Sequence, residues 1–328
     1  MTHKTLVGGT AYNITGGKSL VSGTTYSIKG GRTLVWGTGY NISFGEEPTA
    51  MLYSDGSFVF QEGDEVESGK TLTASYTGFE DINTSPPWNG KQNTFNSVSF
   101  NTEIAPKSMY YWFYNAGNMK AYINSFTNLN INNVTSMFRT YYYCSNLTGS
   151  PVCGNNVIDM SYAYYYCRNL TGSPVCGSNV TNISYTYCYC SNLTGSPVCG
   201  DKVTNMFYAY RNCYNLTGSP VCGNNVTNMY GAYFECKNLA SNAYFYSSSI
   251  SNIAQCFSNW PRTKYLNLYL PANSTSLTTA LYNNTSSMVG TTITWTNDTA
   301  NNRYYNTYYN IYIYPVANVA AARAANGD

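Results

Sequence analysis

Charged side chains are scarce in this sequence. Asp, Glu, Lys and Arg make up 10% of the 328 residues, and the formal net charge is +2. A chain so close to neutral lacks the basic surface that attracts nucleic acid or an anionic membrane. We therefore expect neither nucleic acid nor a membrane among its partners.

Histidine is almost absent, since His3 is the only one. This excludes most mechanisms that use nucleophilic or acid-base catalysis. The sequence also lacks a Cys-x-x-Cys pair of the kind that binds zinc. We expect no catalytic residues, no metal and no cofactor, and the protein is predicted not to be an enzyme.

Acidic residues are few outside the first third of the chain. One cluster there is dense enough to be considered as a ligand set, namely Glu62, Asp64, Glu65 and Glu67. Carboxylate oxygens suit calcium, but the same pattern is typical of the solvated rim of a hairpin. We prefer the second interpretation.

Long apolar runs are missing as well. The first residues contain no apolar run of signal-peptide length, and no uncharged apolar stretch approaches the ~20 residues that cross a membrane. We expect that the protein is not exported by such a signal. Its composition is nevertheless typical of extracellular surfaces. A virion component, assembled inside a cell and released by lysis, reconciles the two observations.

A 23-residue repeat is the clearest feature that is present. The segment NLTGSPVCG begins at Asn146, Asn169, Asn192 and Asn215. A fixed period of this length indicates a solenoid, built by stacking units that cannot bury their apolar faces alone. Near-identical units present equivalent side chains and no unique pocket, so the repeat predicts binding.

Apolar residues within each unit follow the spacing of one helix face. In the first unit Val134, Met137, Tyr141, Cys144 and Leu147 are separated by three, four, three and three residues. The Thr-Gly-Ser-Pro segment would end such a helix, and Val-Cys-Gly leaves room for only a brief strand. Candidate N-cap residues precede the runs: Asn133, Asn156, Asn179, Asp201 and Asn225.

A second, 14-residue repeat fills the start of the chain. Thr10, Tyr12 and Ile14 alternate with other residues, as do Thr24, Tyr26 and Ile28 and then Thr38, Tyr40 and Ile42. This is the period of a strand, and glycine pairs supply the turns, so each copy is predicted to be two short strands around a tight turn. Such small hairpins are not stable alone. We expect them either to pack on another chain or to form an ordinary small sheet.

Four regions follow from these patterns. Residues 1–48 hold the 14-residue repeats, which we expect to anchor the protein, and residues 49–104 form a small β domain with a turn at Asp55 and Gly56. Residues 105–265 form the solenoid. Residues 266–328 form a β-rich C-terminal cap and a tail, which is either a short helix or frayed.

The cysteines form two ladders at the 23-residue period. One comprises Cys144, Cys167, Cys190, Cys213 and Cys236, and the other Cys153, Cys176, Cys199 and Cys222. Neighbouring rungs lie within disulfide range, but equivalent side chains point the same way. We therefore expect buried, reduced thiols that act as small apolar residues.

These rungs resemble the leucine-rich repeats of the BspA type, also called the Treponema pallidum type. The resemblance is carried by Asn133 to Met137, continuing through Tyr141, Cys144 and Leu147, and it covers roughly residues 100–295. It implies a leucine-rich-repeat fold, surface display and adhesion. We accordingly expect an α/β solenoid with 23-residue rungs, an N-terminal β-rich repeat module and a β-rich C-terminal cap.

The sequence departs from this family in one respect and resembles a second group elsewhere. Tyrosine stands where the family usually has phenylalanine, so each hydroxyl needs a hydrogen-bond partner if it is buried. The N-terminal Gly-Gly-Thr repeats and the MLYSDGSFVF segment are similar to structural proteins from bacteriophages and prophages of gut Firmicutes. This second resemblance implies a virion.

Positions that vary between rungs are the candidate ligand-binding residues. Two equivalent columns lie off the apolar face: Arg139, Tyr162, Tyr185 and Tyr208 form one, and Tyr142, Tyr165, Cys188 and Arg211 the other. Their tyrosines and arginines would suit stacking on sugars or contact with a protein. Alternatively, neighbouring tyrosines pack on one another or against a sister subunit.

The expected function is that of a non-enzymatic protein on the surface of a phage virion. It would be a head decoration, a head fibre or a tail adhesin, attached to the virion or to sister subunits through its N-terminal part. The solenoid would bind a glycan or protein of the host surface, and we expect a homo-oligomer. The alternatives are a structural lattice or fibre subunit and a BspA-like adhesin on a bacterial cell surface.

Overall fold

Two hairpins open the chain. The computed structural model describes residues 3–7, 10–14, 18–21, 24–27, 47–282, 288–289 and 294–328. Strand β1 (His3–Val7) pairs with β2 (Thr10–Ile14), and β3 (Lys18–Val21) pairs with β4 (Thr24–Ser27), both antiparallel. The first two copies of the 14-residue repeat are therefore hairpins, as predicted. The third copy, with Thr38, Tyr40 and Ile42, lies outside the described residues.

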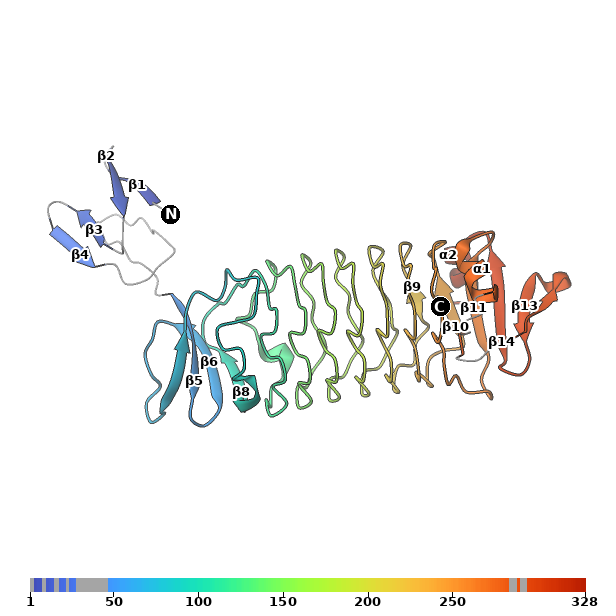
Figure 1. The fold of residues 1–328 in the computed structure, drawn as a ribbon, viewed down its shortest axis with the longest axis horizontal. Helices are drawn as coiled ribbons and strands as arrows, with labels where there is room; N and C mark the ends of the chain where they lie inside the picture. Colours follow the sequence, from blue (N-terminus) through green and yellow to red (C-terminus); the bar gives the residue numbers. More distant parts are fainter. Residues whose placement is uncertain are drawn as a thin grey trace.

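A four-stranded sheet follows, in the order β7-β5-β6-β8. Strands β5 (Pro48–Tyr53) and β6 (Ser57–Glu62) are antiparallel across the predicted turn, where Gly56 takes a φ of 80°. This left-handed φ favours glycine. Strand β7 (Leu72–Tyr76) runs antiparallel to β5, and β8 (Ser97–Phe100) runs parallel to β6. Figure 1 shows this sheet closing one end of a row of stacked coils.

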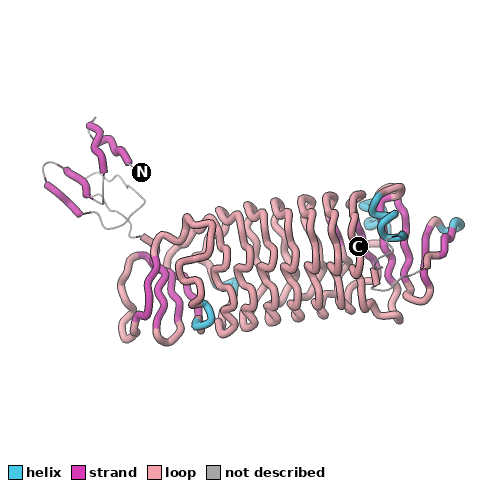
Figure 2. The backbone as a smooth tube through the Cα atoms, in the orientation of Figure 1, coloured by secondary structure: helices cyan, strands magenta, loops and turns pink. Residues whose placement is uncertain are grey.

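The coils are built almost entirely of turns, as Figure 2 shows. Single parallel bridges join equivalent residues of successive coils, from Ser136 to Asp159, Asp159 to Asn182, Asn182 to Asn205 and onward to Asn252. Two short 3-10 helices, at Gln92–Thr94 and Ile123–Ser125, precede the regular part. One copy of the longer repeat is thus one circuit of the chain, and each circuit lies on the one before it.

The predicted α/β solenoid of the leucine-rich-repeat type is wrong. The described residues contain only two α-helices, α1 (Thr275–Tyr282) and α2 (Val319–Ala325), and both follow the coils. The helix expected in every rung is absent from 133–240. The brief strand expected at Val-Cys-Gly forms only once among these rungs, as β9 (Val221–Cys222).

Backbone geometry explains why the turns replace a helix. Arg139 has a φ of 53° and Tyr143 a φ of 59°, whereas a right-handed helix needs about −63° throughout. The amide N–H groups of alternate residues therefore bond to different partners. Tyr141 N–H donates to the Ala163 carbonyl of the next coil at 2.8 Å, while Cys144 N–H donates back to Tyr141 at 3.1 Å. Half of the amides in this segment join one coil to the next, so stacking takes the place of helical bonding.

Three of the five residues predicted to cap helices instead join coils. Asn156 donates from Nδ2 to the Asn132 carbonyl at 2.7 Å, and Asn179 donates to Asn155 at 2.8 Å. Asn225 does the same to Asp201 at 2.7 Å. Each side chain satisfies a carbonyl of the preceding coil, and none caps a helix because no helix follows in 133–240.

A sheet of six strands ends the chain, in the order β12-β13-β14-β11-β10-β9. Strands β9, β10 (Asn242–Phe245), β11 (Leu266–Pro271) and β14 (Ile311–Val316) are parallel neighbours. Strands β13 (Arg303–Asn306) and β12 (Thr296–Asp298) add an antiparallel edge, and a 3-10 helix at Thr299–Asn301 joins them. The tail forms α2, whose first turn is capped by Asn318, with Oδ1 accepting from Ala321 N–H at 3.0 Å.

One hydrophobic core runs from the first sheet through the coils to the last strands. The apolar residues picked from the sequence are its members: Val134, Met137, Tyr141, Cys144 and Leu147 are all 0% exposed, and their equivalents in later coils are buried too. The apolar pattern therefore identified the core correctly and the secondary structure wrongly. No helix among the described residues is long and apolar enough to span a membrane.

Candidate functional site

The candidate ligand-binding residues lie together on one side of the coils. A continuous series of contacts links them: the Arg139 guanidinium lies 5.0 Å from the Tyr162 ring centroid, and Tyr162 stacks on Tyr185 at 4.5 Å. Tyr185 contacts Tyr208 at 5.4 Å, and Tyr208 lies 4.7 Å from the Arg211 guanidinium. We call this surface the aromatic strip; its predicted members are Arg139, Tyr142, Tyr162, Tyr165, Tyr185, Tyr208 and Arg211.

The second predicted column adds a shorter stack. Tyr142 and Tyr165 lie face to face, with ring centroids 4.9 Å apart and planes 10° apart. Cys188 continues this column but is 1% exposed, so it belongs beneath the strip. The tyrosines themselves are half-buried. Their ring faces are largely used against one another, and the stacking of sugars on those faces is therefore a poor description of what the strip offers.

Several strip residues were missed from the sequence. A third column follows the second by one residue, and Tyr143 stacks on Tyr166 at 4.4 Å. The coil that begins at Met109 contributes Tyr111 and Tyr114, which face Arg139. In the sequence this coil is marked by the pattern Met-Tyr-Tyr-Trp-Phe-Tyr, which is equivalent to the segment that starts at Met137. The offset from Met109 to Met137 is longer than the offset between later coils. The further members are Tyr110, Tyr111, Tyr114, Phe138, Tyr143, Tyr166, Tyr189, Phe207, Tyr230 and Phe234.

Four tyrosines of the strip, namely Tyr162, Tyr165, Tyr185 and Tyr208, are neutral at physiological pH. Burial raises the pKa of Tyr162, Tyr165 and Tyr185 above the ordinary value for a phenol. Burial, assisted by a hydrogen bond with Tyr230, raises the pKa of Tyr208 to about 12. The hydroxyls can donate and accept hydrogen bonds, but none is poised to act as a base near pH 7. The formal charge of the strip comes from its arginines.

Inside the coils, tyrosine stands where the resembled family usually has phenylalanine. We call these stacked tyrosines the Tyr ladder. Tyr141, Tyr164, Tyr187, Tyr210 and Tyr233 stack at successive centroid distances of 5.2, 5.6, 5.7 and 5.5 Å. The Tyr187 hydroxyl donates to the Val175 carbonyl at 2.6 Å and accepts from its N–H at 3.1 Å. Tyr141 Oη and Tyr233 Oη are buried and have no hydrogen-bond partner among the described residues. Among the described residues, partners therefore exist only in the middle of the ladder.

All eleven cysteines are free in this structure; nine are buried, as expected, and Cys153 and Cys176 are partly buried. In the first ladder each thiol donates to a carbonyl of the preceding coil. Cys167 Sγ lies 2.9 Å from Tyr141 O, and Cys190 Sγ lies 2.9 Å from Tyr164 O. Burial raises the pKa of both thiols well above the ordinary value. Thiols of this kind are poor nucleophiles, so the ladder is structural.

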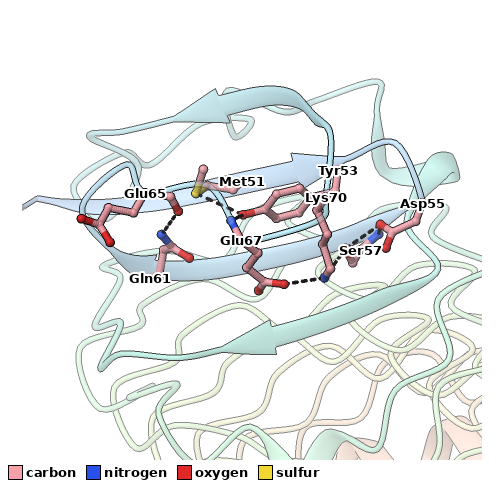
Figure 3. A network of polar contacts seen from close by, with 8 residues as sticks. All are labelled: Met51, Tyr53, Asp55, Ser57, Gln61, Glu65, Glu67 and Lys70. Atoms are coloured by element: carbon pink, nitrogen blue, oxygen red, sulfur yellow. Dashed lines mark hydrogen bonds and ion pairs between the residues drawn. The ribbon is translucent and has the colours of Figure 1, made fainter.

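A polar network on the outer face of the first sheet is the nearest approach to catalytic geometry (Figure 3). Ser57 Oγ donates to Asp55 Oδ1 at 2.6 Å and accepts from Lys70 Nζ at 3.1 Å. A lysine that activates serine must be neutral. The Glu67 carboxylate, 2.7 Å from Lys70 Nζ, instead raises the pKa of Lys70. The network therefore holds the segment between β6 and β7 in place and supplies no nucleophile.

The acidic cluster near this network has no metal-binding geometry. Among residues 47–282, 288–289 and 294–328, no group of three or more His, Cys, Asp or Glu side chains is arranged to hold an ion. Glu67 is paired with Lys70, and the Glu65 carbonyl accepts from Gln61 Nε2 at 2.8 Å. These contacts fit the rim of a hairpin, which was the preferred interpretation.

Comparison of the chain with protein-family models, with curated proteins and with solved structures finds no match. The site must therefore be interpreted from its own geometry. The aromatic strip combines neutral hydroxyls, rings fixed by mutual packing, and arginines. Such a surface suits recognition by contact and hydrogen bonding.

Proposed function

We propose that the protein is a non-enzymatic binding protein that presents the aromatic strip to a glycan or protein of a host surface. The single observation that carries this proposal is the continuity of the strip, from Arg139 through Tyr162, Tyr185 and Tyr208 to Arg211. Tyrosine and arginine dominate the energy of many interfaces. Tyrosine also supplies a large contact area at a small entropic cost.

Mutual packing prepares this surface before a partner arrives. Tyr162 and Tyr185 are held with planes 12° apart, and Tyr142 and Tyr165 with planes 10° apart. Side chains already fixed lose little further freedom when they bind, which favours affinity. The strip belongs to the coils, whose backbone is hydrogen-bonded from one circuit to the next beneath it.

The place that we propose for the protein is the surface of a phage virion, as a head decoration, head fibre or tail adhesin. This part of the proposal rests on the resemblance of the N-terminal Gly-Gly-Thr repeats to bacteriophage and prophage structural proteins. The repeats would attach the protein to the virion or to sister subunits, while the coils face outward. Antibody labelling of particles released by lysis would test it. Label confined to intact bacterial cells would favour a BspA-like cell-surface adhesin instead.

Retention of the labelled full-length chain on a panel of gut Firmicutes cells tests the binding function. We expect Tyr162→Ala combined with Tyr185→Ala to reduce retention by about ten-fold or more, because central aromatic residues carry much of an interface's energy. Tyr265→Ala is the matched control, since Tyr265 is 56% exposed and lies outside the strip. Equal retention of both variants, with folding verified by circular dichroism, would contradict the proposal.

The second candidate function is that of a structural subunit in a lattice. The half-buried rings of the strip favour it. Lateral packing of two strips would cover these rings. End-to-end growth has less support, because a sheet covers the first coil and the last sheet finishes with the three-residue edge strand β12. Sedimentation of the wild type and the Tyr162→Ala/Tyr185→Ala variant separates the candidates: a lattice predicts that only the wild type self-associates.

A further inference from the structure

Two arginines of the aromatic strip lack an acidic partner. Arg139 and Arg211 form no ion pair with any carboxylate in the described part of the chain. Both lie against aromatic rings instead. A third arginine, Arg168, lies over the Tyr166 ring at 3.9 Å and is exposed. The strip therefore carries positive charge that no described carboxylate neutralises.

Arg139 is enclosed by rings on several sides. Its guanidinium lies between 5.0 and 6.0 Å from five ring centroids, those of Tyr111, Tyr114, Phe138, Tyr142 and Tyr162. Nη1 donates to the Tyr111 hydroxyl at 2.5 Å, and Nε is buried without a partner among the described residues. The rings hold the planar group in one orientation. Nη2 is not among the buried unpaired atoms and has no protein acceptor in the described structure.

Arg211 repeats this arrangement farther along the stack. Its guanidinium lies 4.7 Å from the centroids of both Tyr208 and Phe234, and Nε donates to Asn212 Oδ1 at 3.2 Å. Neither Nη atom donates to an acceptor in 47–282, and neither is counted among the buried unpaired atoms. Two donors of a fixed fork are thus left for an outside acceptor, and this fork matches an oxyanion.

Nearby acidic side chains are already engaged. The Asp159 carboxylate accepts from Ser161 N–H at 2.8 Å and from Ser161 Oγ at 2.6 Å. The Glu235 carboxylate pairs with Lys237 at 2.7 Å and accepts from Asn259. Neither forms an ion pair with an arginine of the strip in the described structure. The two arginines remain available to an anion from outside the molecule.

The spacing of the arginines is set by the coils. Arg139 is equivalent to Tyr208, which shares a coil with Arg211, so three coil steps separate them. At about 4.8 Å for each step, the two cations are about 14 Å apart along the axis of the stack. Neutral tyrosine hydroxyls occupy the positions between them. The part of the strip between Arg139 and Arg211 is therefore a row of tyrosines with a cation at each end.

We propose that the aromatic strip binds a linear anionic polysaccharide, whose acidic groups meet Arg139 and Arg211 and whose hydroxyls meet the tyrosines between them. This inference rests on the proposed function and names its ligand class. An extended acidic peptide fits less well because it would gain affinity by pairing with free backbone groups. The amides that underlie the strip are occupied: Arg139 N–H donates to Ser161 O at 3.2 Å and Tyr162 N–H to Ser184 O at 2.9 Å.

Calorimetry of the full-length chain with matched polymers tests the inference without any substitution. The probes are polygalacturonate, alginate and poly(glycerol phosphate), with fully methyl-esterified polygalacturonate as the neutral control. We expect at least one polyanion to bind, with affinity that falls as salt is added. For polygalacturonate, esterification should weaken binding by about ten-fold or more, because paired charges are removed.

Variants then locate the binding. Arg139→Gln combined with Arg211→Gln should weaken binding of the polyanion by about ten-fold or more. Arg262→Gln is the matched control, because Arg262 also lies over rings, at 4.1 Å from the Tyr308 centroid, but outside the strip. Arg139→Lys keeps the charge and loses the planar fork, so an intermediate loss is expected. Arg211→Gln alone serves if the change at Arg139 impairs folding.

Four results would overturn the inference. One is the absence of binding to all three polyanions, another is equal affinity for polygalacturonate and its ester, and the third is unchanged affinity in the double arginine variant. Equal or tighter binding of polyglutamate would identify an acidic protein as the occupant and also overturn it. Retention on cells that depends on Tyr162 and Tyr185 but not on the arginines would leave the proposed function intact and remove only the anionic ligand.

Discussion

The first sheet and the stacked coils share one hydrophobic core but fill it with different chemistry. In the sheet, Phe60 stacks on Phe100 at 4.6 Å, and Trp88 lies 5.6 Å from the Phe60 ring. The phenylalanine side chains have no polar atom that needs a hydrogen-bond partner, and the Trp88 indole N–H donates to the Trp112 carbonyl at 2.8 Å. The coils use tyrosine and cysteine at equivalent depth, so they bury hydroxyls and thiols that need partners.

This difference shows how the coils are held in register. The Tyr164 hydroxyl donates across its own circuit to the Val152 carbonyl at 2.7 Å. The Cys190 thiol donates to the Tyr164 carbonyl of the coil before it. A ladder of phenylalanine and alanine would pack but would make neither bond. The polar atoms inside the coils therefore specify which circuit lies on which, whereas the sheet obtains its register from the strand ladders.

Alkaline pH should have the largest effect, and it should destabilise the protein through the coils more than through the sheet. Burial raises the pKa of Tyr141, Tyr164, Tyr187, Tyr210 and Tyr233 above the ordinary value of 10.0. In the unfolded chain these phenols ionise near pH 10, while the folded coils keep them protonated. Above pH 10 the unfolded state therefore binds fewer protons, and the free energy of unfolding falls as pH rises.

The expected loss is about 1.4 kcal/mol for each fully buried phenol at pH 11, one unit above the unfolded pKa. Together the ladder tyrosines would remove much of the stability of an ordinary domain. Urea denaturation at pH 8 and pH 11 measures this. The Tyr187→Phe variant, which lacks one titrating group, should show a shallower dependence. An unchanged urea midpoint at pH 11 would show that the ladder is not buried as described.

The next largest effect concerns whether the two regions unfold together. Phe60→Ala in the sheet and Tyr187→Ala in the coils should each destabilise by about 3–5 kcal/mol, as deletion of a buried ring usually does. Because one core joins the regions, we expect a single transition in both variants by calorimetry. Two transitions in Phe60→Ala, with the coils melting as in the wild type, would show that residues 49–104 fold independently.

The sequence predicts which residues are buried better than which secondary structure they adopt. The spacing of Val134, Met137, Tyr141 and Cys144 suits one face of a helix, but it is equally compatible with successive turns that point the same side chains inward. The deciding feature is the positive φ at Arg139 and its equivalents, which tyrosine and arginine rarely adopt. The bonds between coils compensate for this strain, and no local pattern reveals them.

The candidate site was predicted in part for a related reason. The two columns of equivalent positions that contain Arg139 and Tyr142 vary among nearly identical repeats. This variation indicates that they are surface positions. The coil beginning at Met109 was missed because its offset from Met137 is longer than the regular period of the later coils. The enclosure of Arg139 by rings from two neighbouring coils could not be predicted, since it depends on how the coils are stacked.

The smallest effect is the most specific test of the Tyr ladder. Tyr187→Phe removes a hydroxyl that both donates to and accepts from Val175, leaving a part-buried carbonyl and amide without that partner. It should cost about 1–3 kcal/mol, or roughly 2–6 °C in melting temperature. Tyr141→Phe removes a buried hydroxyl with no partner among the described residues. It should be neutral or stabilising by up to about 1 kcal/mol, because the unpaired group no longer has to be desolvated.

Differential scanning calorimetry at pH 7 compares these two substitutions, which delete the same atom from equivalent positions. Tyr233→Phe provides a second neutral case at the other end of the ladder, where Oη is again buried and unpaired among the described residues. Opposite behaviour of the middle and the ends would show that the hydroxyls act through the bonds to the valine backbone. Equal losses at all three positions would instead mean that the hydroxyls contribute by packing alone. In that case the register of the coils would depend on the backbone and cysteine bonds.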